Sequence, residues 1–248
     1  YAGQGEQLFA QGAWQQAAIA YRNAAQIRPD DAELRLMLGE CYLRMGNPLR
    51  ARSFLETALN LQPEMLEARV KMGRALLALG ETRLAERQAR EAQSRHPSAA
   101  GVHELLGDCH RQRSQYDDAL AAYRKALELD SRRPTPLLAM AEICLERRDL
   151  EEAAACYRRA LDLNPNDLGA CVGLAKALRL NGKIDEAVRL VDSALARDPD
   201  HVGARAEQAE VAADRGDAGL AILLYGRILD RNADASPLRA RQAELRIS

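Results

Sequence analysis

Residues 114–130 read SQYDDALAAYRKALELD and carry the clearest pattern in the chain. Apolar residues recur at the three- and four-residue spacing of one helical face, while charged residues keep mainly to the other. Ser114, three residues before Asp117, is typical of a residue that caps the start of a helix. The following SRRP segment at 131–134 should end the helix, because the residue before a proline disfavours helical geometry. We therefore predict a helix from about Ser114 to Asp130.

Versions of this segment recur every 34 residues. One position is alanine in every copy: Ala17, Ala51, Ala85, Ala119, Ala153, Ala187 and Ala221. A second column breaks only at its last member: Ala24, Ala58, Ala92, Ala126, Ala160, Ala194 and Ile228. Two further columns hold turn residues (Gly12, Gly46, Gly80, Ser114, Arg148, Gly182, Gly216) and helix stops (Pro29, Pro63, Pro97, Ser131, Pro165, Pro199, Ala233). Four columns in register without an insertion indicate a repeat array.

Each repeat should contain two helices joined by a glycine turn. In the second repeat we predict a first helix from Ala32 to Met45 and a second from Asn47-Pro48 to about Leu61. Small residues line the first helices where they should meet the alanine column: Gly5, Gly39, Gly73, Gly107, Ala141, Ala175 and Ala209. The predicted units are 1–31, 32–65, 66–99, 100–133, 134–167, 168–201 and 202–235. Residues 236–248 form either a capping helix or half of an eighth unit.

A 34-residue helix pair with small residues at its contact, an aromatic residue in the second helix and a closing proline resembles the tetratricopeptide repeat. The resemblance covers all seven units. It implies an all-α fold, namely a right-handed α-α superhelix of antiparallel helix pairs. It also implies that the first helices form a concave wall, which in this family usually binds protein segments.

Two places depart from the repeat pattern. The closing proline is missing at Ser131, while Pro134 and Pro136 lie at the start of the next helix, and Arg148 replaces a turn glycine. We expect altered local geometry there; a tolerated irregularity is the alternative.

Composition excludes several classes of function. The formal net charge is −1, which gives no electrostatic reason to expect binding to nucleic acid or to an anionic membrane. No apolar run has the length of a membrane span, so we expect no direct membrane insertion. Five cysteines without a CxxC pair favour a reducing cytoplasm, with the periplasm as the alternative if a signal sequence was removed. The chain begins at Tyr1 partway into a repeat, so we expect a fragment, and the excess of arginine over lysine suggests a bacterial source.

Candidate catalytic and metal-binding motifs are incomplete. The HELLG sequence starting at His103 begins like a zinc-protease helix, but Gly107 stands where the second histidine must be. His103 and His110 are seven residues apart, about 10 Å along a helix, too far for one metal ion by themselves. Cys144, Cys156 and Cys171 are better explained as buried thiols. We therefore predict no catalytic site, no metal and no cofactor.

The resemblance indicates which side chains should line the concave wall, namely those on the exposed side of the first helices. The predicted partner-binding residues are Leu36, Glu40, Leu43, Val70, Arg74, Leu77, Glu104, Asp108, Arg111, Leu138, Glu142, Leu145, Val172, Lys176 and Arg179. Leu36 and Leu138 belong to two apolar patches that should face solvent and anchor a partner. In the alternative, these side chains pack between neighbouring first helices. Opposite charges should also form two ladders, Glu40–Arg74–Asp108 and Glu142–Lys176–Glu210.

These observations predict a non-catalytic protein–protein interaction scaffold that binds a partner segment with apolar anchors. The alternative is the substrate- or partner-binding arm of a larger enzyme, of glycosyl- or sulfotransferase type, whose catalytic domain lies outside this sequence. Self-association through the terminal helices is a third option.

Overall fold

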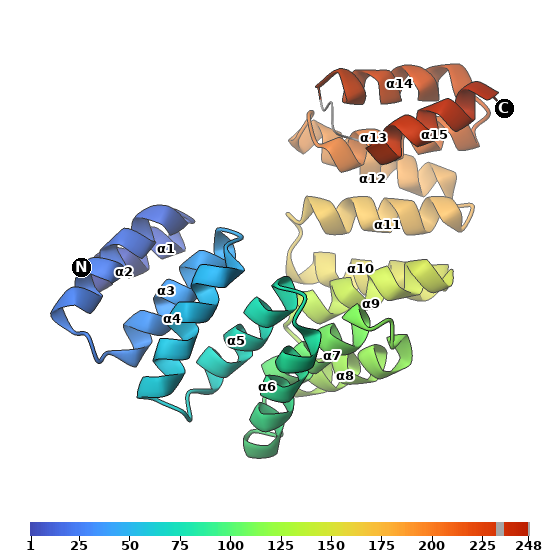
Figure 1. Cartoon of the computed structure of the whole chain (residues 1–248). Helices are drawn as coiled ribbons and strands as arrows, with labels where there is room; N and C mark the ends of the chain where they lie inside the picture. The colour runs from blue at the N-terminus through green and yellow to red at the C-terminus, as the bar shows by residue number, and fades with distance from the viewer. Residues whose placement is uncertain (232–235, 248) are drawn as a thin grey trace. The chain divides into compact units, whose positions relative to one another are not determined.

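The fold was taken from a computed structural model, which describes the backbone of residues 1–231 and 236–247 and the side chains of 1–230 and 238–246. Within these residues the chain forms fifteen α-helices and no strand, which confirms the all-α prediction (Figure 1). By Cα packing the chain divides into two compact parts, Tyr1–Ser131 and Arg132–Ser248, which we describe separately.

The first part contains eight helices. They are α1 (Ala2–Ala10), α2 (Trp14–Ile27), α3 (Ala32–Arg44), α4 (Pro48–Leu61), α5 (Leu66–Ala78), α6 (Thr82–Arg95), α7 (Ala100–Gln112) and α8 (Tyr116–Leu129). The second repeat agrees with its predicted helices to within one residue. Odd-numbered helices are the first helices of the pairs, and even-numbered helices are the second.

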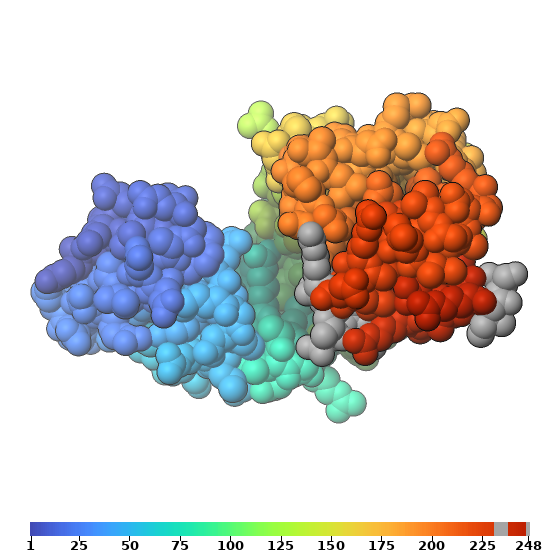
Figure 2. Space-filling view, turned by 90° about the horizontal axis from the view of Figure 1, so that it is seen from above, coloured from blue at the N-terminus to red at the C-terminus, as the bar shows by residue number. Residues whose placement is uncertain are grey.

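Small residues let the two helices of a pair approach closely, and a large side chain fills the adjacent space. Ala17, Ala51, Ala85 and Ala119 are fully buried. A Cβ atom added to Gly39 would lie only 2.6 Å from Cγ of Leu55, so the backbone of α3 rests directly on that leucine. Figure 2 shows that side chains close the spaces between the ribbons, as over α1–α4 in blue.

Two residues without glycine's conformational freedom adopt the glycine turn. Gly12, Gly46, Gly80, Gly182 and Gly216 have positive φ, and so do Ser114 (φ 58°) and Arg148 (φ 66°). The prediction of altered geometry at the Arg148 turn is therefore wrong, because the backbone keeps the left-handed conformation despite its cost for a non-glycine residue.

Ser114 also departs from its predicted role. Because Ser114 occupies the left-handed turn position, it cannot cap the following helix. Gln115 is the N-cap residue, and α8 begins at Tyr116 rather than at Ser114.

The described residues of the second part form seven helices. They are α9 (Pro134–Arg147), α10 (Leu150–Leu163), α11 (Leu168–Leu180), α12 (Ile184–Arg197), α13 (Val202–Asp214), α14 (Ala218–Arg231) and α15 (Ser236–Ile247). Leu238 and Leu245 of α15 pack against a small core that contains Ala209, Tyr225 and Ile228. Exposed charged residues of α15 are Arg239, Glu244 and Arg246. Helix α15 thus covers apolar surface on one side and carries charge on the other.

None of the helices in the described ranges combines the length and the apolar character needed to cross a membrane.

Candidate interaction surfaces

The predicted binding residues fall into two surfaces, one in each part of the molecule. The α3–α5–α7 face comprises Leu36, Glu40, Leu43, Val70, Arg74, Leu77, Glu104, Asp108 and Arg111. The α9–α11 face comprises Leu138, Glu142, Leu145, Val172, Lys176 and Arg179.

Four of these residues are buried. Leu36 and Glu104 are each 1% exposed, and Glu40 and Arg179 are each 8% exposed. The prediction that Leu36 faces solvent is therefore wrong. Leu36 belongs to a core cluster that Val70 joins from the neighbouring first helix, so for this position the packing alternative holds.

Buried ion pairs connect the first helices of the α3–α5–α7 face. Lys71 Nζ on α5 lies 2.8 Å from Glu40 Oε2 on α3, and within α3 the exposed Arg44 places Nε 2.8 Å from Glu40 Oε1. Arg74 Nη2 donates to Glu104 Oε1 at 2.7 Å. The predicted partner of Glu40 was Arg74, and that prediction is wrong. The helices are linked, but each pair joins side chains at different positions of successive repeats.

Asp108 has a different environment from Glu40. It accepts a hydrogen bond of 2.7 Å from the hydroxyl of Tyr123, and within the described residues no ion pair joins it to Arg74, so the last step of the predicted ladder is also wrong. Burial raises the pKa of Asp108, with the nearby Glu104 adding to the shift. For Glu40, burial alone would raise the pKa, but Lys71 and Arg44 outweigh it and lower the pKa. The pKa values of two carboxylates on one face are therefore shifted in opposite directions, that of Glu40 downward and that of Asp108 upward.

The accessible remainder of the α3–α5–α7 face is largely apolar. Leu43, Val70 and Leu77 are half-buried and pack against the core from outside. The side chain of Arg74 is 37% exposed, and Arg111 is exposed. These residues form the surface that a partner can reach.

In the second part, a buried arginine joins two first helices. Arg179 Nε on α11 lies 2.5 Å from Glu207 Oε1, and its Nη1 lies 2.7 Å from Asp214 Oδ2, both on α13. Burial raises the pKa of Glu207, although the hydrogen bond from Arg179 opposes the shift. Arg179 is thus committed to the interior and cannot serve as an accessible binding residue.

Glu210 was predicted to pair with Lys176, and that prediction is wrong. Arg241 of α15 donates to both carboxylate oxygens of Glu210, at 2.8 and 3.0 Å. Burial alone would raise the pKa of Glu210, but Arg241 and the hydroxyl of Tyr225 lower it. Helix α15 is therefore held by a carboxylate of α13.

The accessible part of the α9–α11 face contains half-buried Leu138, Leu145 and Val172 with exposed Glu142 and Lys176. This face repeats the composition of the first: aliphatic side chains flanked by charge.

Sequence reasoning missed Lys71, Glu207 and Arg241, although each holds a first helix to its neighbour. The signal was present as opposite charges 28 to 31 residues apart on successive first helices. Comparing positions at the 34-residue period could not reveal it.

His103, His110 and the five cysteines lie in environments that are typical of structural residues. Nε2 of His103 lies 2.8 Å from the carbonyl oxygen of Pro97, and Nδ1 of His110 lies 3.2 Å from Oε1 of Gln115. All five cysteines are buried, and burial raises the pKa of Cys109 to about 12. Among the described residues, no three histidine, cysteine or carboxylate side chains group closely enough to hold a metal ion.

Comparison with known proteins identifies the family to which this architecture is similar. Models of the tetratricopeptide repeat match residues 8–60, 70–134, 110–159 and 145–211. Protein O-mannosyl-transferase TMTC1 of Homo sapiens is 29% identical over 114 residues, which are 46% of this chain and 13% of that protein. DnaJ homolog subfamily C member 3 of Gallus gallus is 27% identical over 112 residues, 40% of this chain and 22% of that protein. The chain thus spans less than a quarter of these two relatives.

Solved structures show the same fold at low sequence identity. The Cut9 and Hcn1 complex of the APC/C superposes with a TM-score of 0.80 at 18% identity, covering 98% of this chain and 48% of that chain. PilF of Pseudomonas aeruginosa gives a TM-score of 0.71 at 19% identity, covering 88% of this chain and 99% of that chain. The predicted fold class, an all-α superhelix of helix pairs, is confirmed. With repeat models matching more than half of its residues, this chain belongs to the tetratricopeptide repeat family.

Proposed function

We propose that this chain is a non-catalytic scaffold that binds a segment of a partner protein on its first helices. The repeat fold is in general a protein-interaction scaffold. The observation that carries the proposal is the aliphatic surface left accessible on these helices. Leu43, Val70 and Leu77 are half-buried beside the partly exposed Arg74. Apolar side chains that remain reachable beside charged groups are typical of protein-binding surfaces.

The buried ion pairs support this function by fixing the surface before a partner arrives. Glu40 and Glu104 are occupied by Lys71 and Arg74, which belong to the same part of the molecule. A partner therefore meets first helices whose positions are already set, which reduces the ordering cost of binding. The matching segment carries apolar anchors, as predicted, with polar residues between them.

The test uses a peptide selected from a random displayed library on the folded chain, with affinity measured by calorimetry. Leu77→Glu should weaken binding at least about tenfold, a change of about 1.4 kcal/mol, since a charge is placed among the aliphatic anchors. Leu49→Glu is the matched control, because Leu49 is 68% exposed on a second helix. Circular dichroism establishes that both variants fold. Equal affinity for Leu77→Glu and the control would contradict the proposal.

A second candidate function is the binding arm of a larger enzyme. It is favoured by the likeness to the transferase TMTC1, of which this chain matches 13% of the length. The gene that encodes this chain decides between the two. A sugar- or sulfonate-donor domain in the same reading frame would support the arm, whereas its absence would leave the scaffold.

Self-association through the terminal helices stays a prediction. Light scattering over a hundredfold range of protein concentration tests it. A mass that rises with concentration supports self-association, and a constant monomer mass excludes it.

A further inference from the structure

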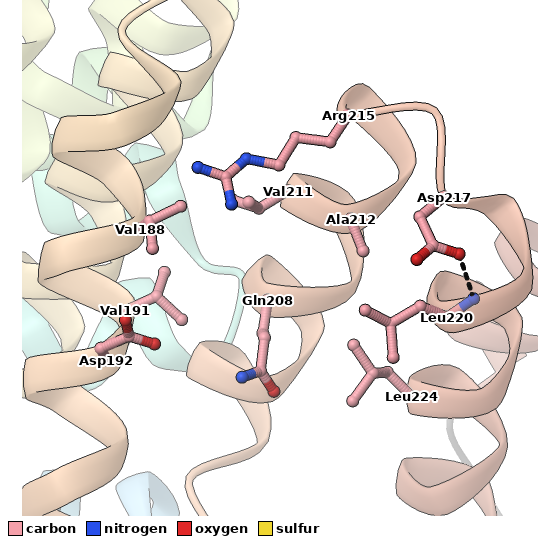
Figure 3. A pocket seen from close by; sticks show the side chains of 10 residues that line it. All are labelled: Val188, Val191, Asp192, Gln208, Val211, Ala212, Arg215, Asp217, Leu220 and Leu224. Atoms are coloured by element: carbon pink, nitrogen blue, oxygen red, sulfur yellow. Dashed lines mark hydrogen bonds between the residues drawn. The ribbon is translucent and has the colours of Figure 1, made fainter.

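A cavity of about 530 Å³ opens between α12, α13 and α14 (Figure 3). Its apolar lining consists of Val188, Val191, Val211, Ala212, Leu220 and Leu224. Asp192, Gln208, Arg215 and Asp217 supply the polar groups. This volume is within the range of pockets that bind small ligands. Two of its walls are second helices, so the cavity is separate from the first-helix surface of the proposed function.

The same groove exists four repeats earlier, between α4, α5 and α6, with a volume of about 300 Å³. Three arginines, Arg52, Arg69 and Arg87, line it. Nη1 of Arg52 lies 2.9 and 3.0 Å from the two carboxylate oxygens of Glu81, the N-cap residue of α6. In the first part of the molecule, an arginine of the chain itself thus crosses the groove and joins its two second helices.

Two arginines of the first groove are replaced by apolar residues in the second, whereas two carboxylates are kept. The third arginine, Arg69, is kept as Arg205, which pairs with Asp200 and lines a neighbouring pocket. Val188 stands where Arg52 stands in the first groove, and Leu223 stands where Arg87 stands. Asp192 and Asp217 occupy the positions of Glu56 and Glu81. The second groove is therefore apolar on its floor, with two acidic groups that no equivalent arginine reaches.

Among the residues that line the cavity, two carboxylates stand against one arginine. Arg215 is the basic residue of the lining, and its Nη2 is already paired with Asp185 at 2.8 Å. Oδ1 of Asp217 accepts a hydrogen bond of 2.9 Å from the backbone NH of Leu220, as drawn in Figure 3, which does not neutralise its charge. Asp192 has no ion-pair partner in the described part of the chain.

We propose that this cavity binds an arginine side chain, together with an adjacent apolar residue, from a segment of a partner protein. The guanidinium group pairs with Asp217 and the aliphatic stem lies on Val188 and Leu224. The partner thus supplies from outside the cation that Arg52 supplies within the first groove. Arginine fits better than lysine, because its planar group pairs with a carboxylate through two parallel hydrogen bonds and its stem covers apolar surface.

The probe is the peptide acetyl-Leu-Arg-Leu-amide, titrated into the ¹⁵N-labelled chain and followed by NMR. The control is the same peptide with citrulline in place of arginine, which keeps the shape of arginine but removes its charge. The arginine peptide should shift the amide signals of the cavity residues, and the citrulline peptide should bind at least about tenfold more weakly.

Three variants sharpen the test. Val188→Arg places an arginine where the first groove has Arg52, so it should occupy the cavity and abolish peptide binding. Asp217→Asn keeps the capping oxygen of α14 but removes the charge, and should weaken binding about tenfold. Ser193→Arg adds the same charge at an exposed position of α12 and should leave affinity unchanged.

Equal affinity for the arginine and citrulline peptides would overturn the proposal. So would signal changes confined to residues outside the cavity, or no binding of the arginine peptide at all. If Val188→Arg does not fold, Asp217→Asn decides on its own. Unchanged affinity of that variant for the arginine peptide would show that the proposed ion pair does not form.

Discussion

Helices α5 and α13 occupy equivalent places, four repeats apart, but carry opposite charges toward their neighbours. In the first part of the molecule, Lys71 and Arg74 of α5 pair with carboxylates on α3 and α7. In the second part, the same two positions are Glu207 and Glu210 of α13, which pair with arginines on α11 and α15. The positions that hold neighbouring helices together are retained, whereas the sign of the charge is inverted.

This inversion shows what the repeat geometry determines and what it leaves to each sequence. The period determines where side chains of successive first helices meet. The sign of the charge at each position can be positive or negative, provided that the side chain it meets on the neighbouring helix has the opposite charge. Because α13 presents acids and α3 also presents an acid, α13 in the place of α5 would put Glu207 against Glu40. Like charges at such a contact would disfavour that pair of neighbouring helices.

The two regions also differ in how deeply their pairs are buried. In the α11–α13 pair the side chains of Arg179 and Glu207 are 7% and 6% exposed. In the α5–α7 pair Arg74 is 37% exposed, although Glu104 is buried. Removing one partner is most costly where the remaining charge has no water to solvate it.

The largest effect on stability is therefore expected from substitution of Arg179. Arg179→Leu should lower the free energy of unfolding by about 3–5 kcal/mol, because Glu207 is left buried without its partner. Arg215→Leu, which breaks the exposed pair with Asp185, should cost less than about 1 kcal/mol. Urea unfolding followed by circular dichroism measures both values.

The double variant Arg179→Leu/Glu207→Leu is the control for this comparison. It should recover most of the lost stability, since no buried charge is left without its partner, and Asp214, which also loses Arg179, is 35% exposed and remains solvated. A cost for Arg179→Leu no larger than that of Arg215→Leu would show that the buried pair does not join α11 to α13.

The next effect concerns pH and the two carboxylates of the α3–α5–α7 face. The pKa of Glu40 is lowered from 4.5, so its ionised form stabilises the fold above that pH, and the stabilisation is lost as the pH falls through the folded value. The pKa of Asp108 is raised from 3.8, so its ionisation costs stability, fully so once the pH exceeds the folded value.

Glu40→Gln should therefore cost about 1–2 kcal/mol at pH 7 and little at about pH 3. Asp108→Asn should raise stability at pH 7, and this gain should shrink as the pH falls toward about 3. Urea unfolding at a series of pH values measures both. Parallel pH profiles for the two variants would contradict the opposite pKa shifts.

A smaller effect of equal size is expected in both parts at the turns without glycine. Ser114→Gly and Arg148→Gly should each stabilise the chain by about 1 kcal/mol, because glycine relieves the left-handed backbone strain. Thermal unfolding of the two variants checks this. Destabilisation by either substitution would show that the side chain contributes more than the strain costs.

The smallest effect on stability is expected in the grooves. Arg52→Val should cost no more than about 1 kcal/mol, since the side chains of Arg52 and Glu81 are 39% and 35% exposed. Urea unfolding measures the change. A loss of several kcal/mol would mean that the arginine of the first groove is part of the core, and the contrast with the second groove would then concern folding rather than binding.

The helices, the repeat family and the buried alanine columns could be predicted because the 34-residue period is visible in the sequence. The choice of ion-pair partners could not. Four of the ion pairs between adjacent first helices join residues 28 to 31 positions apart, and a fifth, Arg179–Asp214, joins residues 35 apart. A column read at the 34-residue period therefore pairs the wrong charges. Glu40 and Arg74 have opposite signs in one column, yet each binds elsewhere.

The accessibility of the candidate surface was only partly predictable, for a related reason. Leu36 and Leu43 are both leucines on one first helix, but Leu36 points toward the neighbouring helix and is buried, whereas Leu43 is half-buried. Which side of a helix faces its neighbour depends on the angle at which the two helices pack. The sequence of a single helix does not determine that angle. The groove between α12, α13 and α14 was missed because it depends on three helices and on two arginines replaced by Val188 and Leu223.

Hydrogen exchange read by mass spectrometry tests the central claim most directly, with the chain free and bound to the library-selected peptide. If the first helices are the interaction surface, protection should concentrate in α3 and α5 or in α9 and α11, and Leu77→Glu or Leu145→Glu should remove it. Protection confined to the second helices, unchanged by these substitutions, would contradict the account.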